Sequence, residues 1–376
     1  MNTKVTRLKS TLGLISFTAI VFILYILKPL IMPILYAVIL AVLIFPIQIF
    51  FEQQWRCNRL FATLSSLTIV FVITVAIITI VYFQLNSLSN NGEDYAKKIA
   101  DLYYSLVETA QKTFNMNRRN TLFSRDLKLE NVFRGNFDKI SDFITQSGAI
   151  LSNLVLVPIY LFFFLYYRRF FRVFYYKLFR NKTKTFLNRM IRKVYNIQQN
   201  YLVGLIKVIL IVGVLNTTGL IILGIDHAIF FGFFAAFLLL IPYVGVIIGS
   251  LLPAVVALAT KDSYWYAFGV IGIFMFIQFL EGNFITPKIT GSKMKINALI
   301  AIMSLIVFSM LWGIAGMIVA LPITATLKII FDNTPGYQVY GFLIGEPVDK
   351  HLQSRARNRL KNWRKIRNNK SIALDT

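Results

Sequence analysis

Long apolar runs separated by short polar breaks dominate the hydrophobic pattern of this chain. Six uninterrupted runs lie at residues 11–27, 30–50, 61–85, 148–167, 203–224 and 264–281. Each is close to the roughly 20 residues that a helix needs to cross the hydrocarbon core of a bilayer. A single strand cannot satisfy its backbone hydrogen bonds in lipid, so these runs predict transmembrane helices even where β-branched residues are common.

Two further apolar runs, 228–260 and 296–330, are interrupted near their midpoints. The interruptions are made by proline and glycine, at Pro242, Gly245, Gly313 and Gly316. Proline lacks an amide donor and glycine loosens the backbone. Broken helix at membrane depth is tolerated only where protein or a water-filled cavity covers it. Because each half is short for a span, we expect two re-entrant or bent hairpins, with full crossings as the alternative.

The polar segments divide the chain into five predicted parts. Residues 86–147 hold nine Lys/Arg and eight Asp/Glu, with two apolar sets at helical spacing that predict a small extramembrane helical domain. Residues 282–295 are predicted as a polar loop, and residues 331–349 as an extended segment. The parts are three N-terminal transmembrane helices (1–85), the extracytoplasmic domain (86–147), the fourth transmembrane helix with a basic amphipathic segment (148–202), the transport core (203–335) and a basic tail (336–376).

The charge pattern predicts the orientation of the chain in a membrane. Residues 168–193 carry ten Lys/Arg and no acid, and residues 350–370 carry nine Lys/Arg. Cytoplasmic loops are enriched in such residues, so the N-terminus, the 168–193 segment and the C-terminus are expected in the cytoplasm. The 86–147 domain then lies outside, which predicts a multi-pass membrane protein with both termini in the cytoplasm.

Composition separates a membrane protein from the other basic classes. The chain is 57% hydrophobic with a mean hydropathy of +0.65, against about 45–50% apolar for soluble domains. A net charge of +24 in a soluble protein would point to nucleic acid. Interleaved basic and aromatic residues in 168–193 could also bind RNA. Because the charge lies beside apolar spans, we expect the lipid bilayer as the partner and no nucleic acid.

Catalytic and cofactor chemistry is not indicated. The chain has one cysteine, Cys57, and two histidines, without metal-ligand spacing, a phosphate loop or a nucleophile–base set. We therefore expect no enzyme activity, no metal and no cofactor.

The candidate transport path centres on Glu281, which ends the 264–281 run. An ionisable group at membrane depth is a functional hypothesis by default, here for binding or relaying a proton or cation. The alternative is a position at the interface, paired with Lys288 or another lysine of the 282–295 loop. Backbone groups freed at the two breaks could hold a polar solute or ion, together with neutral side chains. The path residues are Glu281, Asn283, Gln278, Tyr243, Pro242, Gly245, Gly313 and Gly316.

Three blocks carry a family resemblance: IPYVGVIIGSLLPA (241–254), QFLEGNFITPKITG (278–291) and GIAGMIVALPITATLKII (313–330). As an ordered set they resemble the signature blocks of the autoinducer-2 exporter family of bacterial permeases. The resemblance implies motif roles for ten residues: Pro242, Gly245, Pro253, Glu281, Asn283, Pro287, Gly291, Gly313, Gly316 and Pro322. It also implies a homo-oligomer. Val246 and Asn297-Ala298 depart from the family pattern.

The primary functional hypothesis is an inner-membrane exporter of a small polar solute, for which the resemblance implies an autoinducer-2-like signalling molecule. One alternative is a Na⁺(Li⁺)/H⁺ antiporter centred on Glu281. Another is a membrane scaffold that transports nothing and binds partners through its external domain and tail.

Overall fold

The computed structural model describes residues 13–90 (except 14 and 17), residue 98, and residues 148–241, 244–289 and 294–346. These residues form helices joined by short turns, and their one β-bridge pairs Ile296 with Gly345. Five helical segments in this part are long and apolar enough to cross a membrane. The predicted all-α, polytopic membrane class is thereby confirmed.

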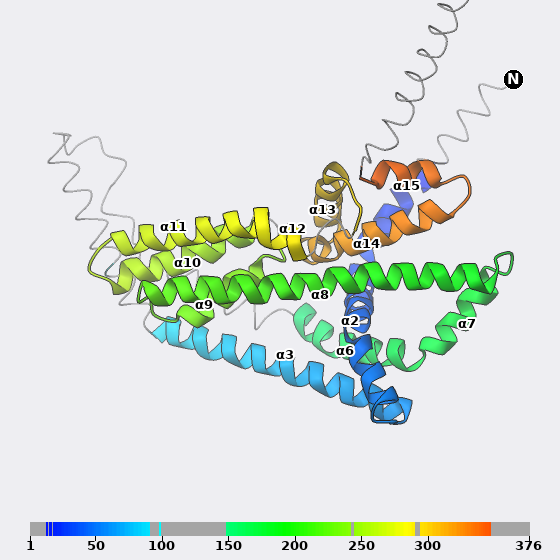
Figure 1. Ribbon diagram of the computed structural model, residues 1–376, viewed down its shortest axis with the longest axis horizontal. Coiled ribbons are helices and arrows are strands. Elements are labelled where there is room, and N and C mark those ends of the chain that lie inside the picture. Colours follow the sequence, from blue (N-terminus) through cyan, green and yellow to red (C-terminus); the bar gives the residue numbers. More distant parts are fainter. Residues whose placement is uncertain are drawn as a thin grey trace, which may run out of the picture.

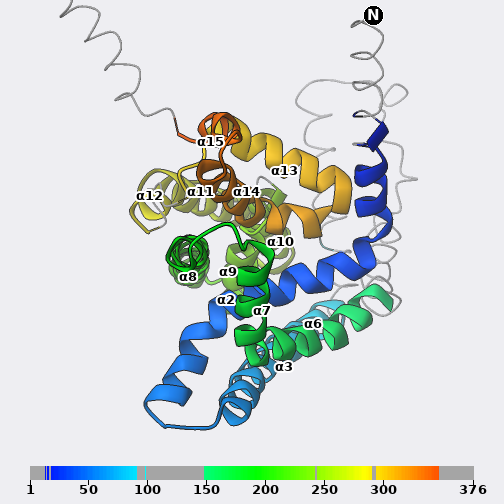
Figure 2. The same ribbon diagram turned by 90° about the vertical axis from the view of Figure 1, so that its right-hand side faces the viewer.

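Three helices form an N-terminal bundle (Figures 1 and 2). They are α2 (Lys28–Gln53), α3 (Arg59–Asn90) and α6 (Gly148–Tyr166). The core between α2 and α6 contains Ala37, Ile44, Leu161 and Leu165. The fully buried Gln48 of α2 donates a hydrogen bond to Thr63 Oγ1 of α3 at 2.9 Å. A buried polar group costs free energy unless it is paired, so this contact helps to fix α2 against α3.

The basic segment and the fifth predicted span fold into two helices. An amphipathic helix, α7 (Arg168–Leu178), turns back into α8 (Lys184–Ile222), whose first turn is capped by the Thr183 hydroxyl. With 39 residues, α8 is about 58 Å long, nearly twice the apolar thickness of a bilayer. In Figure 1 it crosses the whole width of the molecule, and in Figure 2 it is seen end-on. Its basic first half therefore extends beyond the apolar layer that its second half can span.

The first interrupted run folds as a helical hairpin against α8. It consists of α9 (Ala228–Leu238) and α10 (Val244–Thr260), and α11 (Trp265–Leu280) packs on α10. A Cβ placed on Gly245 would lie 1.9 Å from the Leu238 carbonyl oxygen, so only glycine allows the two helices this approach. The predicted break is confirmed. At 11 residues, α9 is too short to cross the bilayer, which favours the hairpin over two crossings.

The second interrupted run breaks at Gly313, between α13 (Ala298–Trp312) and α14 (Ile314–Asn333). Gly313 has φ 68° and ψ −148°, a backbone conformation essentially restricted to glycine. The two halves are unequal, because α14 alone is long enough to span a bilayer. The break packs against the first half of α2, and the Trp312 indole donates a 3.0 Å hydrogen bond to the carbonyl of Leu24, which precedes α2.

The prediction of an extended segment at 331–349 is wrong over most of its described length. There, α14 continues to Asn333 and a short helix, α15 (Gln338–Ile344), packs back on α14. Pro335 and Gly336 lie in the turn between the two helices. They reverse the chain direction in a tight turn and do not form the extended segment expected.

Several predictions fall outside the described residues. Of the extramembrane domain at 86–147, the structure describes only residues 86–90 and 98. The tail after residue 346, as well as Pro242, Tyr243 and Gly291, also lies outside. These remain predictions from the sequence.

Candidate functional site

A widened helical turn carries the predicted central residue. Helix α11 continues through a π-helical turn, η1 (Glu281–Ile285), into α12 (Thr286–Ile289). The Thr286 amide donates to the Glu281 carbonyl five residues earlier. The predicted loop at 282–295 is therefore wrong for 282–289. A proline in a regular helix clashes with the carbonyl four residues before it, and the widened turn lies directly before Pro287. Such turns occur frequently at functional sites.

Glu281 is held by neighbours on its own helix. Its carboxylate accepts a 2.8 Å hydrogen bond from Gln278 Nε2 and a second hydrogen bond from the Thr286 hydroxyl. The side chain is half-buried. Among the described residues it forms no ion pair, so the alternative of a Glu281–Lys288 pair is not observed. The Glu281 carboxylate is thus fixed in place while the residue stays partly accessible to solvent.

Asn283 supports the same turn and is otherwise exposed. Its side-chain amide donates a 2.9 Å hydrogen bond to the Phe279 carbonyl. This hydrogen bond joins η1 to the last turn of α11, and none of the hydrogen bonds described joins Asn283 to Glu281.

A small cavity links this turn to the first break. It has room for about one water molecule, with a volume of about 10 Å³, and lies among α8, α9, α10 and α11. Gln278, Val246 after the break and Asn216 of α8 all line it. The Asn216 side chain is 3% exposed, and its Oδ1 has no hydrogen-bond partner in the described part of the chain. An unpaired buried carbonyl of this kind is a ready acceptor for a water or a hydroxyl group.

A larger groove lies on the other side of the widened turn. Its volume is about 740 Å³, and its walls are α8 on one side and η1 with α12 on the other. The polar groups are Asn200 and Lys207 from α8 and Lys288 from α12, and its described lining residues include no acid. The remaining lining is apolar, as is usual for a small-molecule site.

The sequence analysis did not single out Asn200, Lys207 or Asn216. The available signal was a lone polar residue in an otherwise apolar helix: Lys207 lies in the stretch LVGLIKVILIVGV. Asn200 and Lys207 are seven residues apart, which places them on one face of α8. The sequence does not show that α12 lies opposite this face, and the groove exists only between the two helices.

The other predicted residues lie in separate places. Gly245 is buried in the first hairpin, and Pro253 is buried within α10. Gly313 and Gly316 lie by the N-terminal bundle and line neither cavity. The Pro322 carbonyl accepts a 2.6 Å hydrogen bond from the buried Gln198 of α8. The structure thus brings Gln278, Glu281 and the first break together, but not the second break.

Comparisons with known proteins agree with this architecture. A profile of the family described as "AI-2E family transporter" matches residues 14–336. The chain is 28% identical to YueF of Bacillus subtilis (strain 168) over 266 residues, which are 69% of this chain and 72% of that protein. It is 22% identical to the "AI-2 transport protein TqsA" of Escherichia coli (strain K12) over 327 residues, 84% of this chain and 89% of that protein. The chain therefore belongs to the AI-2E family of membrane transporters.

Proposed function

We propose that this protein exports a small polar solute across the inner membrane and that the groove between α8 and the widened turn binds this solute. The observation that carries the proposal is the position of η1. It lines the 740 Å³ groove with Phe284 and Ile285, and the Glu281 carboxylate at its start accepts a hydrogen bond from Gln278, which lines the small cavity at the first break. A polar solute leaving the groove would thus find hydrogen-bonding groups within one turn of helix.

The groove chemistry favours a solute with many acceptor oxygens. Asn200, Lys207 and Lys288 offer amide and ammonium donors, and the apolar walls accommodate a carbon ring. A hydroxylated furanone of the autoinducer-2 type fits this description. TqsA, a relative along most of its length, is named for transport of AI-2. The comparisons give no support to the antiporter alternative.

The membrane arrangement belongs to the same proposal. The basic segment that contains α7 and the start of α8 lies in the cytoplasm, together with both termini, in accordance with the positive-inside rule. We also propose a homo-oligomer, since small residues and apolar helix faces permit close subunit contact in lipid.

The test is solute flux in proteoliposomes that contain the full chain. Vesicles are loaded with autoinducer-2, a pentose or a sugar phosphate, and efflux is compared with that from protein-free vesicles. We expect autoinducer-2 efflux above the protein-free rate. The variants Lys207→Gln and Lys288→Gln should each lower it about tenfold, because a hydrogen bond to a charged group contributes about 1.5–3 kcal/mol.

Lys261→Gln is the matched control, because Lys261 lies in the turn between α10 and α11 and does not line the groove. Efflux equal to the protein-free rate for every solute would contradict the proposal and favour the scaffold alternative. Unchanged efflux in both groove variants would show that the solute passes elsewhere.

A further inference from the structure

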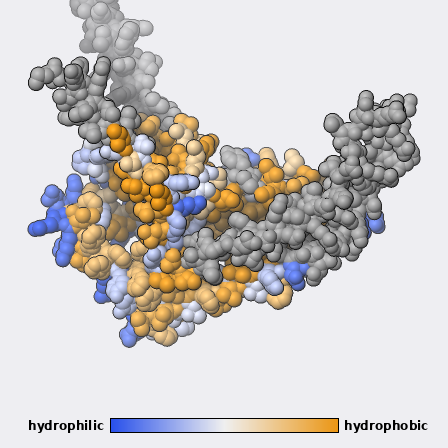
Figure 3. Space-filling model, turned by 180° about the vertical axis from the view of Figure 1, so that it is seen from behind, coloured by the Kyte–Doolittle hydropathy of each residue, from blue (hydrophilic) through white to orange (hydrophobic). Residues whose placement is uncertain are grey.

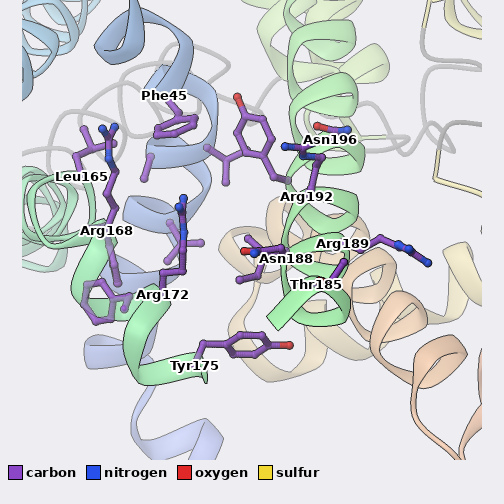
Figure 4. Close-up of a pocket in the computed structure, with 17 residues that line it drawn as sticks. Phe45, Leu165, Arg168, Arg172, Tyr175, Thr185, Asn188, Arg189, Arg192 and Asn196 are labelled. Atoms are coloured by element: carbon purple, nitrogen blue, oxygen red, sulfur yellow. The ribbon is translucent and has the colours of Figure 1, made fainter. Parts of the chain in front are cut away.

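A second large cavity lies at the opposite end of α8 from the hairpin. Its volume is about 1180 Å³, and it opens between α7 and the start of α8, with α2 and α6 behind it (Figure 4). It shares no lining residue with the solute groove or with the small cavity at the first break. Whatever binds here is therefore distinct from the proposed solute site.

Arginines face each other across this cavity. In Figure 4, Arg172 of α7 and Arg192 of α8 point into the gap from opposite walls, with Asn188 beside them. None of the described lining residues is acidic. Guanidinium groups present paired donors that match the oxygens of a phosphate. The gap is therefore suited to an anion with several oxygens.

A third arginine is already fixed in position. Arg168 forms an ion pair with Glu52 of α2 and lies over the Phe45 ring, 5.2 Å from its centroid. Its other terminal nitrogen, Nη1, is buried and has no hydrogen-bond partner among the described residues. Leaving a charged donor buried and unpaired costs free energy. An acceptor atom of a bound ligand could therefore hydrogen-bond to Nη1.

A neutral donor completes the polar wall. Tyr175 of α7 lines the cavity below Arg172 (Figure 4), and burial raises the pKa of its phenol. The hydroxyl therefore remains protonated at physiological pH and can donate a hydrogen bond to an anion.

The wall behind the arginines is apolar. It is formed by Val38, Ala41 and Val42 of α2 and by Phe164 and Leu165 of α6. On the outside of α7, Phe170, Phe174 and Leu178 are exposed. A helix with one aromatic and one basic face lies in the head-group region of a membrane. Figure 3 shows hydrophilic side chains gathered at this end of the molecule and hydrophobic ones over its middle.

We propose that this cavity binds the phosphate head group of an anionic phospholipid, with the start of an acyl chain against the α2–α6 wall. The three arginines and Tyr175 hold the phosphate oxygens, and the apolar wall distinguishes a lipid from a free phosphate. The bound lipid would join α7, α8 and the N-terminal bundle at one point.

The test measures lipid binding by the purified full chain in detergent. The probes are dioctanoyl-phosphatidylglycerol, dioctanoyl-phosphatidylcholine and inorganic phosphate, and the readouts are the dissociation constant and the shift in thermal unfolding temperature. We expect the phosphatidylglycerol to bind at least about tenfold more tightly than the other two probes, since each basic residue near an anionic lipid strengthens binding about fivefold. The double variant Arg172→Gln/Arg192→Gln should lose this preference.

Arg169→Gln/Arg180→Gln is the matched control. Arg169 of α7 and Arg180, in the turn after α7, are exposed, and neither lines the cavity. This variant should bind the lipid like the wild type. An equal unfolding temperature of all variants without lipid shows that the fold is intact.

Two outcomes would overturn the proposal. One is equal binding of the anionic and zwitterionic lipids, or of the wild type and the double variant. The other is inorganic phosphate binding as tightly as the lipid, which would assign the cavity to a soluble phosphate compound. Because the groove variants at Lys207 and Lys288 leave this cavity unchanged, failure of the lipid test and failure of the flux test are distinguishable.

Discussion

At the scale of the residue, Glu281 uses both carboxylate oxygens as acceptors, for Gln278 and Thr286. In Glu281→Gln one of these oxygens becomes an amide donor, so one partner loses its acceptor. We expect autoinducer-2 efflux to fall by about tenfold, the effect of losing one charge-assisted hydrogen bond. The measurement is the initial efflux rate from proteoliposomes at several pH values.

Asp262→Asn is the control for this change, because it removes a carboxylate in the turn after α10. If Glu281→Gln transports like the wild type at every pH, Glu281 neither orients the path nor carries a proton.

Gly316 tests how closely the second hairpin packs. A Cβ at this position would lie 1.9 Å from the Phe308 carbonyl oxygen, so one helix of the pair must move in Gly316→Ala. Forcing extra atoms into a packed interface costs about 1–3 kcal/mol, which should lower the thermal unfolding temperature in detergent. Gly272→Ala provides the comparison: no heavy atom lies within 4 Å of its Cβ, and alanine is the better helix former. Equal unfolding temperatures for the two variants would contradict the packing described.

Which residues the sequence could identify depended on their type. Glu281 was found because a carboxylate at the end of an apolar run is unusual. Its partner Thr286 was not, because a threonine five residues away faces a different side of a regular helix. Asn216 and Lys207 were missed because each lines a cavity that other helices complete. Helix α10 contributes to the small cavity at Asn216, and α12 contributes to the groove at Lys207.

At the scale of the element, the widened turn η1 can be tested by its length. A π-turn is a one-residue insertion in a helix, so deleting Gly282 should restore regular α-helix through residues 281–286. Glu281 and Thr286 would then be four residues apart, and the acceptor geometry around Glu281 would change. We expect an unfolding temperature close to that of the wild type but a loss of autoinducer-2 efflux.

The control for this deletion is Gly282→Ala, which keeps the chain length and adds a Cβ with no heavy atom within 4 Å. It should retain both stability and efflux. Normal efflux in the deletion variant would show that the π-turn has no part in transport.

Element types followed from the hydrophobic pattern, but some boundaries did not. Apolar runs predicted α2, α3, α6 and both broken hairpins, since burial in lipid leaves only helix as a spanning structure. The loop expected at 282–295 was wrong for residues 282–289, because a widened turn tolerates Gly282 and Pro287. The helix α15 was missed because Pro335 and Gly336 mark a turn but carry no signal for the type of the next element.

At the scale of the whole molecule, the first hairpin predicts which turns share a side of the membrane. A Cβ at Gly224 would lie 3.6 Å from the Lys261 ammonium, so the turns before α9 and after α10 are neighbours. In a Cys57→Ser background, cysteines at Asp226 and Asp262 should react with an impermeant maleimide from the outside of cells. A cysteine at Lys182, between α7 and α8, should react only in inverted vesicles.

Protection of both outer positions in whole cells, with reaction only in inverted vesicles, would reverse the proposed orientation. Labelling of positions 226 and 262 from opposite sides would exclude the hairpin itself.

The unbroken course of α8 limits how the protein can move. It runs from the arginine cavity to the first hairpin and is not interrupted by proline or by a turn. Since a continuous helix resists bending at any one point, it behaves as a stiff rod, and the rod has to tilt, rotate or slide as one body. A movement of α8 that widens the arginine cavity at one end therefore also displaces the helix at the first hairpin.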